Sequence, residues 1–318
     1  MDANAAAHQP ATPAVRASLQ RDLALGSIVF LAALDNLGVN ITTLIAGLGV
    51  KAALVPLHGW LPQAMVAPAP VSALLHAVAV VKAGAFGIVR VVYDVYGVNF
   101  TDQLGLLGIL GVVAAVTIIY GSVRALYQDN LKKRLAWSTV SQVSYIALGT
   151  AILGPVGTVG GIVHLVHQGI MKITLFFSAG NYAETLGIHK VSEMNGVGRR
   201  MPGTTLAFTI GALGMIGIPP VAGFISKWYL GLGAVEAGMA AWILPVLVAS
   251  SLLNAAYFMP IVYAAFFREE DPGHYHAEHG EAPLPIVLAL VATALFTILL
   301  FFFPGVPLTL VQQMAGGG

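Results

Sequence analysis

Residues 156–181 read VGTVGGIVHLVHQGIMKITLFFSAGN, a long and predominantly apolar segment. A helix that crosses a bilayer needs about 20 predominantly apolar residues, and this segment is long enough. Its only charged side chain, Lys172, lies near the middle, with no carboxylate in the segment to neutralise it. Placing an ammonium there costs about 2.5–3.5 kcal/mol even on a lenient insertion scale, so such groups usually serve a function. The stretch therefore predicts a membrane helix with a functional lysine.

Three more lysines share this setting. Lys51, Lys82 and Lys227 also lie in apolar segments that contain no carboxylate. Burial lowers the pKa of a lysine, which brings proton exchange closer to neutral pH. Together the four residues predict a membrane protein with a row of titratable sites.

Composition supports a membrane protein. The chain has 318 residues, of which 57% are hydrophobic and only 9% are charged, whereas a soluble domain carries about 25% charged residues. The absence of cysteine excludes disulfides, thiolate metal sites and iron–sulfur ligation by this chain. A net charge of +1 gives no electrostatic case for nucleic acid. We predict an all-α, polytopic protein embedded in the lipid bilayer.

Hydropathy and helix-breaking residues predict about nine spans in a single transmembrane domain, 21–312, which follows a polar, flexible tail, 1–20. The first span is the weakest, because Asp35 and Asn36 interrupt it. The predicted spans are 21–37, 39–57, 69–93, 103–123, 134–153, 156–181, 203–233, 239–267 and 284–304.

Basic residues are strongly biased to one side of this topology. One side has only Arg90, near a helix end. The other side collects Arg16, Arg21, Arg124, Lys132, Lys133, Arg134, Lys190, Arg199, Arg200 and Arg268. Because cytoplasmic loops carry the excess of Lys and Arg, the N-terminus is expected in the cytoplasm and the C-terminus outside a bacterial plasma membrane.

Two lysine-bearing regions share a proline-containing pattern, in which PLHGW (56–60) resembles PVAGF (220–224). Proline removes a backbone donor and breaks the helical ladder, so both segments are candidates for discontinuous helices. Freed backbone groups and half-helix ends can hold ions and water at mid-membrane. A packing kink is the alternative, and it would be preferred for one such element; two, each near a buried lysine, favour an ion path.

One helix face carries several groups that could exchange protons. His164, Gln168 and Lys172 follow each other at four-residue intervals, with His164 about 12 Å along the axis from Lys172. Water that bridges such groups could pass a proton between them. His167 lies one residue off this face, where a neighbouring helix would meet it. The alternative is that the histidines only hydrogen-bond neighbouring backbone groups.

A second group surrounds Lys82. His76 precedes Lys82 by six positions, so the two do not share a helix face, but both could belong to one hydrated path that includes Lys51. Histidine titrates in the physiological range and suits a relay. A structural role for His76 is equally plausible on the sequence alone.

A histidine-rich segment follows the span 239–267. The segment suggests metal ligation, but a solvated acidic loop is the preferred interpretation, because no second ligand group is near in sequence. Phosphate-binding, dinucleotide-binding and nucleophile-elbow motifs are absent. We therefore expect no metal and no cofactor. The residues of this segment are His274, Tyr275, His276, His279 and Glu281.

Several stretches carry a resemblance to a known family. They are KAALVPLHGWLP (51–62), APAPVSALLH (67–76), DNLKKRLAWSTVSQ (129–142), the helix from His164 to Phe177, and GFISK (223–227). They resemble the proton-conducting antiporter family, which includes antiporter-like subunits of respiratory complex I, subunits of Mrp-type Na⁺/H⁺ antiporters and relatives in membrane-bound hydrogenases. MKIT (171–174) and EMNGVGRRMP (193–202) are most similar to the D-type Mrp subunit.

The resemblance implies a role for each buried base. Lys51 matches the lysine of the family's first broken helix, Lys172 its central lysine, and Lys227 the lysine after the second break. The positions that match proton-relay residues of the family are Lys51, His76, Lys82, His164, Lys172 and Lys227.

The family's subunits have about fourteen helices in two inverted five-helix repeats, and the resemblance covers the last nine. It assigns 21–93 to the remainder of the first repeat, 103–267 to the second and 284–304 to the last helix. The part without a counterpart carries a glutamate that pairs with the lysine matched by Lys51, and no residue from 38 to 93 is acidic. We expect a companion chain or neighbouring subunit to supply the missing helices and an acid near Lys51.

The sequence therefore predicts a proton-translocating membrane subunit of a multisubunit, Mrp-type cation/proton antiporter, with Na⁺ as a candidate exchanged ion and other membrane subunits as partners. Such a chain would perform ion translocation rather than chemistry and would bind no redox cofactor. One alternative is an antiporter-like pumping subunit of a redox-driven complex, such as NADH:quinone oxidoreductase or a membrane-bound hydrogenase. A non-conducting structural subunit is the alternative of another class.

Overall fold

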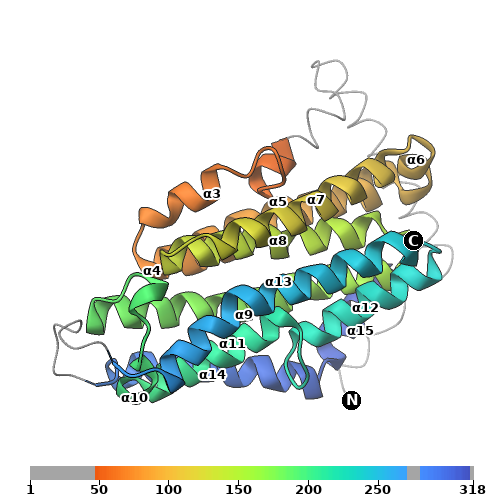
Figure 1. The fold of residues 1–318 in the computed structure, drawn as a ribbon. Helices are drawn as coiled ribbons and strands as arrows, with labels where there is room; N and C mark the ends of the chain where they lie inside the picture. The colour runs from red at the N-terminus through yellow and green to blue at the C-terminus, as the bar shows by residue number, and fades with distance from the viewer. Residues whose placement is uncertain (1–46, 271–279, 316–318) are drawn as a thin grey trace, which may run out of the picture.

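The computed structural model describes residues 47–270 and 280–315, and only the backbone at 75–77 and 312–315. Within these residues the regular elements are helices, apart from one isolated β-bridge between Asn130 and Lys190. The longer helices run roughly side by side (Figure 1). The predicted all-α class is confirmed. The tail 1–20, the predicted span 21–37 and part of 39–57 lie outside the described residues.

Five helical stretches of the described chain are long and apolar enough to cross a membrane. Each coincides with a predicted span, with limits that differ by a few residues. They are Ala69–Tyr96, α7 (Leu106–Leu126), α9 (Pro155–Leu186), α13 (Ala240–Phe267) and α14 (Leu284–Phe302). Two short helices, α6 (Val98–Gln103) and α15 (Gly305–Ala315), were not predicted.

The stretch Ala69–Tyr96 is not a uniform helix. It alternates α-helical and π-helical segments, and the π-helical η2 ends just before Lys82. Single π-turns widen a helix and occur often at functional sites. The segments are α4 (Ala69–Val71), η2 (Ser72–Val80), α5 (Val81–Arg90) and η3 (Val91–Tyr96).

The predicted span 134–153 is α8 (Leu131–Ala151), a nearly fully buried helix that packs against α7 and α9. It begins after Asn130, whose side-chain oxygen accepts a hydrogen bond from the Lys133 backbone N at 3.0 Å. Buried hydroxyls, including those of Thr139 and Thr150, donate to carbonyl groups one turn earlier, which satisfies them inside the helix. This polarity separates α8 from the five strongly apolar helices.

The predicted span 203–233 consists of two helices, α11 (Pro202–Ile216) and α12 (Gly223–Glu236), with a break between them. Gly217 ends α11 with a left-handed backbone, φ +89°, which a side chain would strain. An added Cβ there would also lie 2.7 Å from Lys227 Cδ. The first proline-containing region is broken as well, since residues 47–51 are separated by turns from α3 (Trp60–Gln63). Both predicted discontinuities are present.

Glycines let α9 and α12 approach closely in antiparallel order. A Cβ added at Gly233 would lie 2.4 Å from the Gly157 backbone, and one at Gly160 would lie 2.6 Å from the Leu230 backbone N. Residues one turn further along α9 therefore contact residues one turn earlier in α12. This register decides which side chains of the two helices meet.

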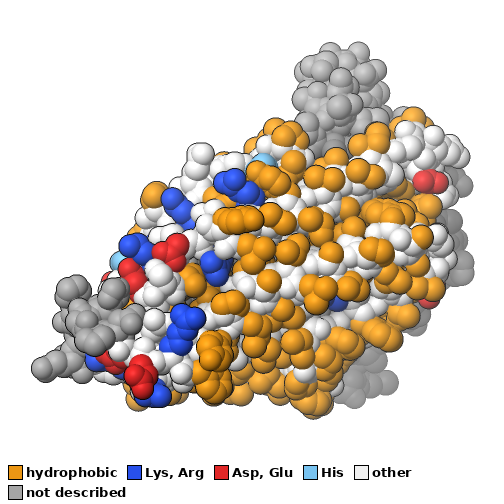
Figure 2. Space-filling view, in the orientation of Figure 1, with side chains coloured by type: hydrophobic (Ala, Val, Ile, Leu, Met, Phe, Trp, Pro, Cys, Tyr) orange, Lys and Arg blue, Asp and Glu red, His pale blue; other side chains and the backbone are white. Residues whose placement is uncertain are grey.

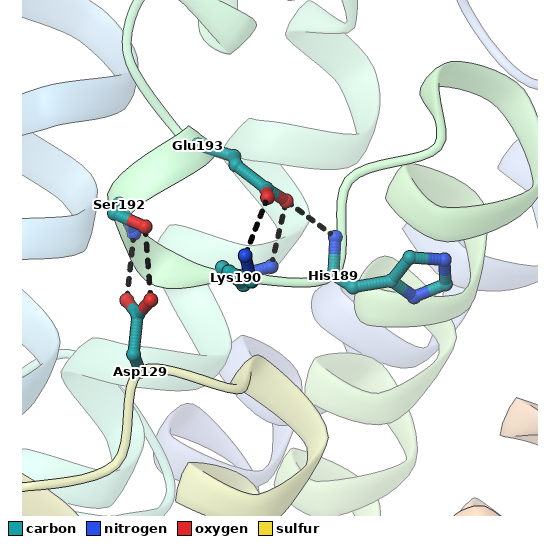
Figure 3. A network of polar contacts seen from close by, with 5 residues as sticks. All are labelled: Asp129, His189, Lys190, Ser192 and Glu193. Atoms are coloured by element: carbon teal, nitrogen blue, oxygen red, sulfur yellow. Dashed lines mark hydrogen bonds and ion pairs between the residues drawn. The ribbon is translucent and has the colours of Figure 1, made fainter.

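Charged side chains gather at the end of the molecule where α10 (Val197–Arg200) lies (Figure 2). There the Asp129 carboxylate accepts hydrogen bonds from the backbone N and the hydroxyl of Ser192, at 3.0 and 2.9 Å (Figure 3). Glu193 accepts from the backbone N–H groups of His189 and Lys190. These contacts join the start of α8 to η4 (Val191–Glu193), so the predicted loops 124–134 and 182–202 meet.

Glu281 corrects the interpretation of the acidic segment. Its carboxylate accepts hydrogen bonds from the backbone N–H groups of Gly203 and Thr204, at 2.8 and 3.1 Å, and from the Thr204 hydroxyl at 2.5 Å. Glu281 therefore caps α11 and joins it to the segment before α14, rather than lying in a solvated loop. His274, Tyr275, His276 and His279 lie outside the described residues.

Candidate functional site

Lys172 is fully buried in the middle of α9. Its ammonium nitrogen donates hydrogen bonds to the backbone carbonyl of Leu135, at 3.0 Å, and to the hydroxyl of Ser138, both on α8. The ion pairs of the described residues do not include it. The site thus offers Lys172 hydrogen-bond acceptors but no counter-charge.

Lys82 is buried against the same helix. Only 5% of its surface is exposed, and its ammonium nitrogen has no hydrogen-bond partner among the described residues. A Cβ added at Gly169 would lie 2.9 Å from this nitrogen. Gly169 follows Gln168, so Lys82 reaches α9 between His164 and Lys172. The helices that carry Lys82 and Lys172 therefore meet at this point.

Lys227 lies at the break between α11 and α12. Its ammonium nitrogen donates to the carbonyls of Met215 and Ile216, at 3.1 and 2.8 Å, and to the Ser251 hydroxyl at 2.9 Å. The last carbonyls of a helix lack intrahelical donors and form the negative end of its dipole, so they suit a cation. Lys227 also lines a cavity of about 640 Å³ together with Trp228.

His164 joins α9 to the Lys227 region. It is fully buried, and its Nδ1 lies 2.8 Å from the Ser226 hydroxyl on α12. Its ring centroid is 5.1 Å from that of Tyr145 on α8. The ammonium of Lys227 lies 5.4 Å from the same tyrosine ring. Residues from three helices thus form one contiguous group.

One face of α8 links Lys172 to Lys227. Ser138 contacts Lys172, and Gln142 follows Ser138 by one turn. The Gln142 side-chain nitrogen donates to the Met215 carbonyl at 3.4 Å, and Lys227 donates to this same carbonyl. The side chains of Ser138 and Gln142 therefore lie between Lys172 and Lys227.

Sequence analysis did not assign Ser138, Gln142, Tyr145, Ser226 or Ser251 to the site. Ser138, Gln142 and Tyr145 recur at helical spacing in α8, and this was the only signal that could have found them. Ser226 and Ser251 gave no signal, because their positions depend on helix register.

Buried polar atoms without hydrogen-bond partners concentrate around this group. Leaving such an atom unsatisfied costs about 1–3 kcal/mol. Groups of this kind are normally satisfied by buried water. The atoms are Lys82 Nζ, Gln142 Oε1, the Tyr145 hydroxyl, His164 Nε2, both ring nitrogens of His167 and both amide atoms of Gln168.

Lys51 differs from the other three lysines, because its side chain is exposed. Its backbone packs on α5, since a Cβ added at Gly84 would lie 2.6 Å from Lys51 Cβ. Gly84 is two residues from Lys82, so Lys51 adjoins the Lys82 helix. The side chain of His76 lies outside the described residues, and its role stays a prediction.

The arrangement is chemically suited to moving protons. Amines, imidazoles and hydroxyls can each accept and release a proton, and here they lie on adjoining helices. Within the described residues no group of three His, Asp or Glu side chains is arranged to hold a metal ion.

A protein-family model described as "NADH:quinone oxidoreductase/Mrp antiporter, TM" matches residues 24–253. NADH-quinone oxidoreductase subunit N of Desulforudis audaxviator is 41% identical over 249 residues, which are 76% of this chain and 47% of that protein. Hydrogenase-4 component B of Escherichia coli is 35% identical over 274 residues, 80% of this chain and 40% of that protein. The chain spans about half the length of these relatives.

Solved structures share the fold. A chain of the Mrp complex from a Dietzia species superposes with a TM-score of 0.80 at 24% identity, covering 94% of this chain and 66% of that one. A chain of respiratory complex I from Thermus thermophilus gives a TM-score of 0.76 at 23% identity, covering 96% and 67%. With the family match over most of its length, this membrane chain belongs to the NADH:quinone oxidoreductase/Mrp antiporter family of antiporter-like subunits.

Proposed function

We propose that this chain is a proton-translocating subunit of a multisubunit, Mrp-type cation/proton antiporter in a bacterial plasma membrane. The observation that carries the proposal is the row of titratable side chains on α5, α9 and α12, of which Lys82, His164 and Lys172 are buried and Lys227 is half-buried. Lys82 contacts α9, Lys172 contacts α8, and α8 leads to Lys227. No carboxylate of the described residues locks these lysines into ion pairs.

The proposed path crosses the helices in a fixed order. A proton moves from the Lys51 region to Lys82, with His76 as a further candidate, and then reaches α9. On α9 it is shared between His164 and Lys172. It leaves through Lys227, which lies at the far end of the row beside a mostly apolar cavity. Buried water would satisfy the unpartnered polar atoms along this path.

The proposed orientation puts the charged end of the molecule in the cytoplasm, with the C-terminus outside. The clustering of Lys and Arg at that end supports it (Figure 2). Asn99, in the predicted outer loop, lies in α6 at the opposite end (Figure 1).

The proposed partners are other membrane subunits, one of which places an acid beside Lys51. The exposed Lys51 side chain supports this, because a cation in a membrane needs a counter-charge or water. No described residue pairs with it.

A redox-driven complex is the second candidate, because NADH-quinone oxidoreductase and hydrogenase subunits are among the relatives. In that case the same path would pump protons for a reaction that occurs in other subunits. Purified native complex would separate the two: copurifying redox subunits favour the pump.

The test uses the complex that contains the full chain, reconstituted in liposomes with a pH-sensitive dye inside. Lys172→Met should abolish proton flux while the complex still assembles. Lys172→Arg should also fail, because arginine stays protonated and cannot release the proton. Lys133→Met is the matched control, since Lys133 is an exposed lysine at the start of α8. Wild-type flux in Lys172→Met would refute the relay and favour a structural subunit.

A further inference from the structure

His167 is a buried titratable residue that the proposed path does not use. None of its surface is exposed, and neither ring nitrogen has a hydrogen-bond partner among the described residues. Met171, one turn further along α9 on the same face, contacts the start of α12, since a Cβ added at Gly223 would lie 3.3 Å from its methyl carbon. His167 therefore faces the break between α11 and α12.

The same face of α9 continues as a column of hydroxyls. Thr174 and Ser178 follow His167 by about two and three helical turns. The Thr174 hydroxyl donates to the Thr293 hydroxyl on α14 at 2.8 Å. The Ser178 hydroxyl donates to the Thr174 carbonyl at 2.9 Å and lies 3.5 Å from the Thr204 carbonyl on α11. The column thus runs between α9, α11 and α14.

The column ends at a carboxylate and a cavity. The Asn181 side-chain nitrogen donates to the Thr204 hydroxyl at 3.2 Å, and this hydroxyl donates to Glu281 at 2.5 Å. A cavity of about 400 Å³, lined by Asn181, the exposed Glu184 and Pro283, adjoins this end. A cavity of this size holds several water molecules. Protons can therefore reach the column from the charged end of the molecule.

No other base interrupts the column. α11 and α14 contain no Asp, Glu, His or Lys. A proton that enters beside Glu281 therefore meets His167 as the first basic side chain. His164 lies three residues before His167 on α9, which is less than one helical turn away.

We propose that a second proton-access route runs from Glu281 along this hydroxyl column to His167, which passes the proton to His164. The inference rests on the proposed function and adds an entry point to it. Water beside Glu281 delivers the proton. Further water has to link the hydroxyls, because Ser178 bonds to the Thr174 and Thr204 carbonyls, which do not relay protons. Water also has to cross the roughly 10 Å between Thr174 and His167, past the buried side chain of Met171. One ring nitrogen of His167 accepts the proton and the other releases one, so the imidazole becomes neutral again and no other bond changes.

The test uses His167→Val and Thr174→Val in the reconstituted complex. Replacing an unpartnered buried imidazole by an apolar side chain should leave the melting temperature of the complex unchanged or raise it. Proton flux should nevertheless fall, because one of the two entry routes is lost, and the flux that remains should be the part that enters through Lys51 and Lys82. Thr150→Val is the matched control, because Thr150 is buried with the same bond to a carbonyl one turn earlier, but lies at the far end of α8. Its flux should equal that of the wild type.

Parallel measurement of Lys172→Met separates the two proposals. Wild-type flux in His167→Val and Thr174→Val, together with no flux in Lys172→Met, would overturn the access route and leave the relay standing. Wild-type flux in Lys172→Met would overturn the relay itself. If Thr174→Val does not assemble, Thr293→Val removes the other hydroxyl of the same pair and carries the same expectation.

Discussion

The ammonium nitrogen of Lys227 lies 2.8 Å from the carbonyl oxygen of Ile216, at the end of the helix that precedes the break. The lysine thus rests on the negative end of α11 while belonging to α12. A cation held by carbonyl dipoles is less firmly fixed than one held by a carboxylate. In the proposed path, this contact would let the break hold a charge and still release a proton.

The contact predicts different effects for two substitutions of Lys227. Lys227→Arg should preserve assembly, because a guanidinium can also donate to helix-end carbonyls, but it should abolish proton flux because it does not deprotonate. Lys227→Met should abolish flux and also lower the melting temperature of the complex, because it leaves the carbonyls of α11 without their cation. Thermal unfolding and dye-based flux on both variants give the readout. Substantial flux through the arginine variant would contradict a role for Lys227 in proton release.

Close packing of α9 on α12 predicts a strong effect at Gly160. A Cβ there would lie 2.6 Å from the Leu230 backbone, so Gly160→Ala must push the two helices apart. Overpacking of this kind costs about 1–3 kcal/mol, and it would also separate His164 from Ser226. We expect a lower melting temperature and reduced flux. Gly108→Ala is the control, because an added Cβ at Gly108 in α7 meets nothing within 4 Å; equal losses in both variants would contradict the argument.

The proposed orientation predicts the labelling of single cysteines, which is straightforward because the chain has none of its own. A cysteine at the exposed Asn99 should react with a membrane-impermeant reagent added from outside intact cells. A cysteine at the exposed His189 should react only in inverted vesicles. Labelling of the Asn99 cysteine from the cytoplasmic side alone would invert the topology.

The sequence was sufficient to predict the burial of Lys82 and Lys172, the helical class and both broken helices, whereas Lys227 is half-buried and Lys51 is exposed. These features follow from local patterns: an unpaired charge in an apolar run, and proline where a helical ladder would continue. The partners of those lysines could not be predicted, because they depend on helix register. Ser226 meets His164 only because glycines bring α9 and α12 together in one antiparallel alignment.

Glu281 is a second example of a contact that could not be predicted from the sequence, because its partners are far away in the chain. It lies in a short acidic segment that gave the pattern of a solvated loop. The fold brings it to Gly203 and Thr204, nearly eighty residues earlier, where it caps α11. A cap supplied by a distant residue has no local signature, unlike the Asn130 cap of α8, which lies next to its helix.

The exposed Lys51 predicts an acidic partner. We expect a glutamate or aspartate of a companion chain or neighbouring subunit within about 4–6 Å of its ammonium, the range over which an opposite charge acts strongly. Lys51→Met should reduce proton flux, and replacing the partner's acid by its amide should reduce it to a similar degree. The double variant should be no worse than either single variant, because both act on one interaction. Residue-specific cross-linking from a cysteine at Lys51 would identify the acidic segment.

The companion itself can be tested by coexpression. The chain produced alone should be unstable or inactive, and it should conduct protons when it assembles with the companion that cross-links to position 51. A purified preparation of the single chain that moves protons as fast as the intact complex, with no acid near Lys51, would contradict the account. In that case the ammonium of Lys51 would donate hydrogen bonds to water alone. The relay would then begin at Lys82, whose amine is already buried against α9.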